Sequence, residues 1–204
     1  MIRALVCDLG NVLLHFDHRL IVHRLAGNMP TRRMDAEFEQ RFWPTVHDFE
    51  RGRIDTDTFL TDAAALLGSD RAVTKEEFRL LWADIFWPNE ELIALLAALR
   101  SHIALVLLSN TNPLHIQFAS HRFPALFSLF DAAVYSYEAG TVKPDPAIYQ
   151  TALARAGVAP EHTLYFDDIA AYVDAAAALG MHAYQYVSVA AARDVLRMYD
   201  LVPD

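Results

Sequence analysis

A small set of polar residues that could do chemistry lies at the ends of apolar runs, or in a loop that follows one. They are Asp8, Ser109, Asn110, Lys143, Asp167 and Asp168. A short apolar run that ends in turn residues predicts a buried β-strand. In an open α/β sheet, ligands bind beyond the carboxyl ends of the strands. The positions therefore predict one site that combines carboxylates with a hydroxyl, an amide and an ammonium group.

This combination of groups suits a phosphorylated substrate. Mg²⁺ prefers oxygen ligands and is usually held by one or two carboxylates together with substrate phosphate and water. Lys143 and Ser109 supply donors for phosphate oxygens, and charge-assisted hydrogen bonds are the stronger kind. Asp8 can attack phosphorus to give an aspartyl-phosphate, which divides one difficult step into two. Because phosphoryl transfer depends mainly on positioning and charge stabilisation, these residues predict phosphoryl-transfer chemistry.

Alternating strands and helices must position these groups. Apolar runs predict a first strand that ends at Asp8 and further strands at residues 102–108, 132–136, 163–166 and 182–187. Helical patterns occupy residues 90–99, 114–121, 147–156, 170–179 and 189–198. This alternation predicts βαβ units and therefore an α/β fold with a doubly wound, Rossmann-like parallel sheet.

The segment between the first two strands has a helical pattern instead. Apolar spacing indicates helices near Leu20–Leu25, near Phe38–Trp43 and at Thr56–Leu67. Thr74, followed three residues later by Glu77, has the form of a capping box and predicts a fourth helix. We therefore expect an all-helical cap domain at residues 15–88. The core domain would consist of residues 1–14 and 89–204.

Composition excludes several other classes of protein. The 204 residues are 54% hydrophobic, which is enough to bury a core. A net charge of −9 argues against non-specific nucleic-acid binding, which needs a basic surface. We expect a cytoplasmic protein that makes no membrane contact, because Cys7 is the single cysteine and neither a signal-peptide pattern nor a run of ~18 apolar residues is found. The oligomeric state is not predicted.

Four segments in chain order resemble the motifs of the haloacid dehalogenase (HAD) superfamily. They are Asp8–Val12, Leu107–Asn110, Lys143–Tyr149 and Phe166–Asp168. The helical insertion resembles the cap of subfamily I. Within the superfamily, the chain resembles the bacterial α-D-glucose-1-phosphate phosphatase-like branch, through the sequences Asp-Leu-Gly-Asn at its start, Ser-Asn-Thr-Asn at 109–112 and Glu-Arg-Gly at 50–52.

The resemblance implies a role for each residue of the site. Asp8 would be the nucleophile, and Lys143 would be the second catalytic residue. Ser109, Asn110 and Lys143 would bind the phosphate. Mg²⁺ would be bound by the side chains of Asp8 and Asp168 and by the carbonyl of Gly10. Asp167 could support the metal from behind its ligands, or could cap the following helix.

Two positions depart from the pattern that the resemblance implies. Gly10 stands where most phosphatases of the superfamily have a second Asp that acts as general acid and base. Such help is typically worth about 10²–10⁴-fold in rate. The glucose-1-phosphate phosphatase-like branch lacks this Asp too, and an anomeric phosphate, as a good leaving group, needs less acid assistance. Tyr172 stands where the superfamily usually has Asp or Asn, and the nearby Asp174 lies about half a helical turn further on.

The sequence therefore predicts a Mg²⁺-dependent phosphatase that acts on a small phosphorylated metabolite, with a sugar phosphate as a candidate, through an aspartyl-phosphate. Two alternatives remain open. Gly10 and Tyr172 allow a catalytically impaired binding or regulatory protein. An Asp nucleophile also allows a 2-haloacid dehalogenase, whose reaction needs no metal.

Overall fold

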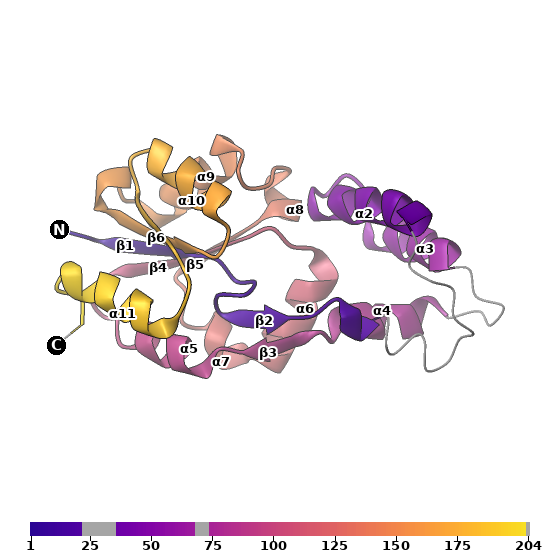
Figure 1. Cartoon of the computed structure of the whole chain (residues 1–204), viewed down its shortest axis with the longest axis horizontal. Helices are drawn as coiled ribbons and strands as arrows, with labels where there is room; N and C mark the ends of the chain where they lie inside the picture. The colour runs from indigo at the N-terminus through magenta and orange to yellow at the C-terminus, as the bar shows by residue number, and fades with distance from the viewer. Residues whose placement is uncertain (22–35, 68–73, 203–204) are drawn as a thin grey trace.

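The computed structural model describes residues 1–21, 36–67 and 74–202. Most of the helix predicted near Leu20–Leu25 lies outside these ranges. Figure 1 shows an elongated molecule in which a layered α/β core occupies one end and a group of helices occupies the other.

The core is built on a parallel sheet of five strands in the order β5–β4–β1–β6–β7. The strands are β1 (Ala4–Cys7), β4 (Ala104–Ser109), β5 (Ala132–Tyr135), β6 (Thr163–Asp167) and β7 (His182–Gln185). Cys7 pairs with Leu107 on one side and with Phe166 on the other. The strand order reverses at β1, which confirms the predicted doubly wound fold and places Asp8 at the switch point where such sheets bind ligands.

Alternating side chains of β1 belong to two hydrophobic clusters, one on each face of the sheet. Leu5 and Cys7 belong to the cluster covered by α5 (Glu90–Ala97), α6 (Pro113–Arg122), α7 (Pro124–Phe127) and α11 (Val189–Met198). Val6 belongs to the opposite cluster, covered by α9 (Pro146–Ala156) and α10 (Ala170–Ala178). A strand that is apolar at every position fits a sheet buried on both faces.

The described helices between residues 17 and 85 form a separate hydrophobic cluster. They are α2 (Ala36–Glu50), α3 (Thr56–Leu67) and α4 (Lys75–Ala83). Aromatic residues dominate this cluster, with Phe49 stacked on Phe59 at 4.3 Å between ring centroids. The predicted capping box at Thr74 and Glu77 is present at the start of α4.

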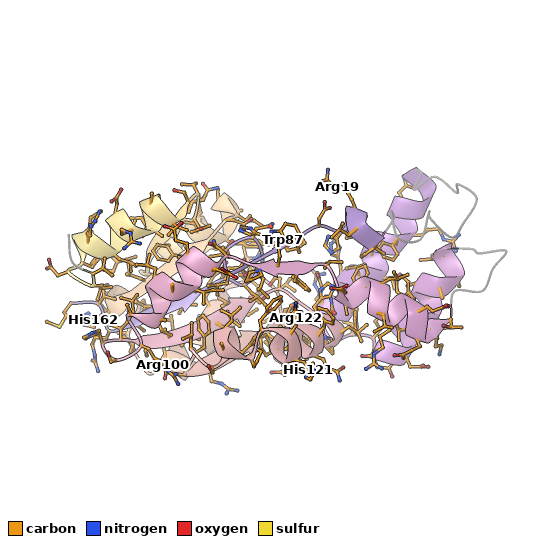
Figure 2. The ribbon with its side chains drawn as sticks, turned by 90° about the horizontal axis from the view of Figure 1, so that it is seen from below. Arg19, Trp87, Arg100, His121, Arg122 and His162 are labelled. Atoms are coloured by element: carbon orange, nitrogen blue, oxygen red, sulfur yellow. The ribbon has the colours of Figure 1, made fainter. Side chains whose placement is uncertain are left out.

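The structure departs from the prediction of helices throughout residues 15–88 at both ends of that segment. Strands β2 (Leu14–Phe16) and β3 (Phe86–Pro88) pair as a short antiparallel ribbon that carries the chain between core and cap. Aromatic residues favour such a pleated surface, and the Phe16 and Phe86 rings meet edge to face. Trp87, labelled in Figure 2, is 46% exposed on this ribbon.

The carboxyl ends of the core strands point toward the cap. Arg100 and His162 precede β4 and β6, and Figure 2 shows both at the end of the core that is remote from the cap. The short helix α8 (Ser136–Ala139) follows β5 and lies beside α2 (Figure 1). Among the described residues, no helix is long and apolar enough to cross a membrane.

Candidate active site

A tight turn places Asp8 at the end of the central strand. The main-chain N–H of Asp8 donates to the Phe166 oxygen at 2.9 Å, and the chain then folds back so that the N–H groups of Leu13 and Leu14 donate to the Leu9 oxygen. Asn11 adopts a φ of 54°, a left-handed conformation that Asn tolerates better than most residues. The side chain of Asp8 is therefore held at the sheet edge.

Lys143 reaches both acidic strand ends from the loop between α8 and α9. Its Nζ lies 2.7 Å from Oδ1 of Asp8 and 2.6 Å from Oδ2 of Asp167, with a longer contact of 3.4 Å to the main-chain oxygen of Leu108. The Lys143 side chain is 1% exposed. Burial acts to lower the pKa of this ammonium, but its contacts with Asp8 and Asp167 outweigh burial and raise the pKa. Lys143 is therefore charged and joins β1 to β6.

Asn110 fixes the backbone of Lys143. Its side-chain oxygen accepts from the Lys143 N–H at 2.8 Å, and its side-chain nitrogen donates to the Lys143 carbonyl at 3.1 Å. The structure thus brings Asn110 and Lys143 together, and the predicted direct contact of Asn110 with phosphate stays a prediction. Ser109 is buried at the same strand end, and its hydroxyl makes no hydrogen bond to another described residue. The predicted contact of the Ser109 hydroxyl with phosphate stays a prediction.

The two carboxylates after β6 have different surroundings. Asp167 is fully buried; its Oδ2 accepts from Lys143 and from the Tyr165 hydroxyl, and its Oδ1 accepts from the Ile169 N–H. Asp168 is half-buried, and burial, followed by the charge of Asp167, raises its pKa. Because both oxygens of Asp167 are already bonded within the protein, Asp168 is the carboxylate of this pair that is better able to bind a ligand.

The three carboxylates form a group that fits a divalent cation. Asp8, Asp167 and Asp168 each offer an oxygen within 4.8 Å of the others, and the Lys143 ammonium forms ion pairs with Asp8 and Asp167. Burial raises the pKa of Asp8 to about 7; Lys143 opposes this shift, and Asp167 adds to it. Carboxylate oxygens are the ligands that Mg²⁺ favours, so Asp8 and Asp168 could bind the ion while the negative charge of Asp167 lies nearby. The ligand roles predicted for Asp8, Gly10 and Asp168 stay predictions.

Both residues that depart from the sequence pattern lie within the site. A Cβ built on Gly10 would come 2.9 Å from Cε1 of Phe16, so the β2 aromatic occupies the space beside this glycine. The ring of Tyr172 lies under the Lys143 ammonium, 5.1 Å from Nζ to the ring centroid. The Tyr172 hydroxyl accepts a long hydrogen bond of 3.4 Å from the Asn110 side chain.

Tyr165 is a site residue that the sequence analysis did not identify. Its hydroxyl donates to Asp167, although the rest of β6 before that residue reads as an apolar strand. The available signal was its position two residues before Asp167, since alternate residues of a strand face the same side. A tyrosine at that spacing can place its hydroxyl on the carboxylate.

The cap reaches the core beside the same sheet edge. The Ser136 hydroxyl accepts from the Thr111 N–H at 2.9 Å and donates to the Glu50 carbonyl at 2.6 Å. Gly52 packs against the main chain of Tyr137, so closely that an added Cβ would lie 2.2 Å from the Tyr137 oxygen. Burial raises the pKa of Glu50 to about 7, against the opposing charge of Arg51. The end of α2 is therefore docked on the core next to the loop that carries Asn110.

Comparison with known proteins gives consistent results. A family model described as haloacid dehalogenase-like hydrolase matches residues 2–180. A D-ribitol-5-phosphate phosphatase from Bacteroides thetaiotaomicron is 28% identical over 196 residues, covering 91% of this chain and 92% of that protein.

Solved structures share the fold. A HAD family enzyme from Bacteroides thetaiotaomicron, in complex with magnesium and inorganic phosphate, superposes with a TM-score of 0.81 at 24% identity, covering 93% of this chain and 96% of that one. A predicted HAD-like family hydrolase from Porphyromonas gingivalis gives a TM-score of 0.79 at 29% identity, covering 97% and 98%. The finer resemblance to the glucose-1-phosphate phosphatase-like branch stays a prediction. Because the family model spans most of the sequence, the chain belongs to the haloacid dehalogenase-like hydrolase family.

Proposed function

We propose that this protein is a Mg²⁺-dependent phosphatase that hydrolyses a small phosphorylated metabolite through an aspartyl-phosphate. The observation that carries the proposal is the buried contact of Lys143 with both Asp8 and Asp167, beside the more accessible Asp168. It is supported by the D-ribitol-5-phosphate phosphatase relative and by the similar HAD family structure that holds magnesium and inorganic phosphate.

In the proposed reaction, a carboxylate oxygen of Asp8 forms a bond to phosphorus while the bond from phosphorus to the leaving oxygen breaks. Gly10 has no side chain to donate a proton, so the leaving oxygen takes its proton from water. A second water then attacks phosphorus while the bond from phosphorus to the Asp8 oxygen breaks, which releases inorganic phosphate and restores the Asp8 carboxylate. The proton that this water gives up neutralises the hydroxide left by the first step. Lys143 and Ser109 hold the phosphate oxygens throughout, and Asn110 acts through the Lys143 backbone.

The metal would be held by the side chains of Asp8 and Asp168 and by the carbonyl of Gly10. When bound, it would offset the negative charge that the phosphate and the carboxylates bring together. Asp167 would remain behind the ligands, because its oxygens are bonded to Lys143, Tyr165 and the Ile169 N–H.

We propose a sugar phosphate or a sugar-alcohol phosphate as the substrate class. The Asp that usually serves as general acid is replaced by Gly10, which favours a substrate with a good leaving group, such as an anomeric phosphate. The relative that acts on D-ribitol 5-phosphate supports a primary phosphate instead. The cap, residues 15–88, would close over the phosphate site and select between them. A cytoplasmic location is part of this proposal and is supported by the single, buried Cys7.

A phosphomonoester panel tests the proposal directly. We expect the purified protein with Mg²⁺ to release phosphate from one or more sugar or sugar-alcohol phosphates, including glucose 1-phosphate and ribitol 5-phosphate. EDTA should stop the reaction. Asp8→Asn should reduce it to background although the variant still folds, as a thermal unfolding transition would show. Hydrolysis that survives Asp8→Asn would remove Asp8 as the nucleophile. Metal-independent release of halide from a 2-haloacid would replace the proposal with a dehalogenase, and absence of hydrolysis from the whole panel would leave a binding protein.

A further inference from the structure

Tyr172 contacts two residues of the phosphate side of the site. Its position three residues into α10 places the ring 5.1 Å from the Lys143 ammonium. Its hydroxyl accepts from the side-chain nitrogen of Asn110 at 3.4 Å. The sequence resemblance leads to the expectation of Asp or Asn at this position, and a phenol is a poor substitute for either as a Mg²⁺ ligand. Its contacts must therefore serve another purpose.

The ring acts on Lys143 without using any of the ammonium hydrogens. Two of those hydrogens are directed to Asp8 and Asp167 at 2.7 and 2.6 Å, and the third makes only the 3.4 Å contact with the Leu108 oxygen. An aromatic face attracts a cation through its electron density, and the attraction strengthens where water is excluded. The ring can therefore hold the ammonium in place while its weakly bonded hydrogen turns toward a phosphate oxygen.

The hydroxyl acts on the same lysine through Asn110. The Asn110 side-chain nitrogen that donates to Tyr172 also donates to the Lys143 carbonyl, and the oxygen of that amide accepts from the Lys143 N–H. The backbone of Tyr172 is itself bonded within the core, because the Tyr149 hydroxyl donates to its main-chain oxygen at 3.0 Å. One side chain thus contacts Lys143 at its ammonium and, through Asn110, at its backbone.

We propose that Tyr172 is a positioning residue for phosphate binding: its ring holds the ammonium of Lys143 and its hydroxyl holds the amide of Asn110. This inference rests on the proposed phosphatase function. It assigns Tyr172 to the phosphate side of the site, whereas a carboxylate at the same position would be expected to act on the metal.

Two variants of Tyr172 separate the ring from the hydroxyl. Tyr172→Leu removes both, and Tyr172→Phe removes only a long hydrogen bond. Tyr199→Leu is the matched control. Tyr199 follows α11, is also half-buried, and is hydrogen-bonded through its hydroxyl to Tyr184 and His182 of β7. For each protein we would measure the Kd for inorganic phosphate at saturating Mg²⁺, the Kd for Mg²⁺ alone, the Tm, and kcat and KM for the best substrate of the panel.

We expect Tyr172→Leu to weaken phosphate binding and raise KM about tenfold, and Tyr172→Phe to stay within about threefold of wild type. The Kd for Mg²⁺ alone should stay within about twofold for both, because the ring contacts the ammonium rather than the metal ligands. Tyr199→Leu should lower Tm and leave the Kd for phosphate and the Kd for Mg²⁺ unchanged.

Three outcomes would overturn the assignment. A Tyr172→Leu variant with unchanged phosphate affinity and KM but a lower Tm would make Tyr172 purely structural. A shift confined to the Kd for Mg²⁺ would move it to the metal side of the site. A loss in Tyr172→Phe as large as that in Tyr172→Leu would remove the role of the ring. Failure of the phosphatase proposal itself looks different, since wild-type protein would then bind no phosphate and hydrolyse no phosphomonoester.

Discussion

Gly10 occupies a position where the space for a side chain is taken by another residue. A Cβ at Gly10 would lie 2.9 Å from the Phe16 ring, closer than side-chain carbons normally approach. Phe16 cannot withdraw freely, since it packs edge to face against Phe86 of the paired strand and contacts the hydrophobic cluster of the cap. Packing of Phe16, which belongs to the β2–β3 ribbon, therefore explains why position 10 has no acidic side chain.

Restoring an acid at position 10 should require a smaller residue at position 16. We expect Gly10→Asp alone to lower the free energy of unfolding by about 1–3 kcal/mol through overpacking. With Phe16→Ala also present, the new carboxyl has room to donate a proton to a poor leaving group. The double variant should then hydrolyse an alkyl phosphate about tenfold or more faster than Phe16→Ala alone, with a smaller gain for p-nitrophenyl phosphate.

The single variant Phe16→Ala is the control, because it creates the same space without the acid. Urea unfolding would measure stability, and initial rates at fixed Mg²⁺ would measure the two substrates. A Gly10→Asp protein as stable as wild type would contradict the steric explanation. Equal gains for both phosphates would contradict a role in leaving-group protonation.

For the side chains of the site, the sequence predicted which residues lie together but not how they are bonded. Asp8, Lys143, Asp167 and Asp168 could be placed together because each follows a recognisable strand or precedes a proline-rich turn. The bonds of Asn110 to the Lys143 backbone depend on the path of a loop far away in the chain, which local patterns do not specify.

The α2–α3 connection is the element that docks the cap beside the site. The Glu50 carbonyl accepts from Ser136, and Gly52 then turns with a φ of 67° directly against the main chain of Tyr137. A side chain at Gly52 would be destabilising for two reasons. The left-handed conformation is strained for residues with a Cβ, and that Cβ would clash with the Tyr137 oxygen 2.2 Å away. Glycine at this position therefore allows both the turn and the close packing of the α2–α3 connection on Tyr137.

Gly52→Ala should separate these two costs when it is compared with Gly157→Ala. Gly157 has a similar φ of 63° but has open space where its Cβ would be. Each variant should lose about 1–2 kcal/mol from the left-handed conformation. We expect Gly52→Ala to lose a further 1–3 kcal/mol or so, or else to displace the connection and raise KM with little change in kcat. Urea unfolding and steady-state kinetics would distinguish the two results, and equal behaviour of the variants would show that the contact with Tyr137 is unimportant.

Among the helices and strands, long patterns were predictable and short ones were not. The pattern was clearest for β1, β4 and β6, because buried parallel strands are nearly continuous in hydrophobic residues. The edge strands β5 and β7 were also predicted, although they are less buried. Strands β2 and β3 are three residues each, too short to show a period. Their pairing depends on the two chain crossings between cap and core coming side by side, which no local signal contains.

At the level of the whole molecule, the described residues form one hydrophobic cluster on each face of the sheet and a third among the helices α2, α3 and α4. The cap has its own cluster of buried aromatics, to which the core contributes Leu114 from α6. His115, next in that helix, is buried; its Nε2 lies 3.1 Å from the Trp82 oxygen of α4, and its ring stacks on Trp82. These contacts and the ribbon join cap and core at one end of the sheet. That is also the end where Asp8, Asp167 and Asp168 lie together and where Lys143 forms ion pairs with the first two.

The excess negative charge at that end should make folding stability depend on Mg²⁺. A ligand that binds only the folded state stabilises it by about 2.7 kcal/mol at 100 times its Kd. At 100 times its Kd, Mg²⁺ should therefore raise the free energy of unfolding by about 2.7 kcal/mol. The reference would contain NaCl in place of MgCl₂ at the same ionic strength. Asp168→Asn should abolish most of the increase, because it removes the more accessible carboxylate of the group. Asp174→Asn removes an equal charge from an exposed position on α10 and should retain the increase. If both variants respond to Mg²⁺ like wild type, the cation binds elsewhere; if Asp174→Asn alone loses the response, Asp174 rather than Asp168 is the ligand from this part of the chain.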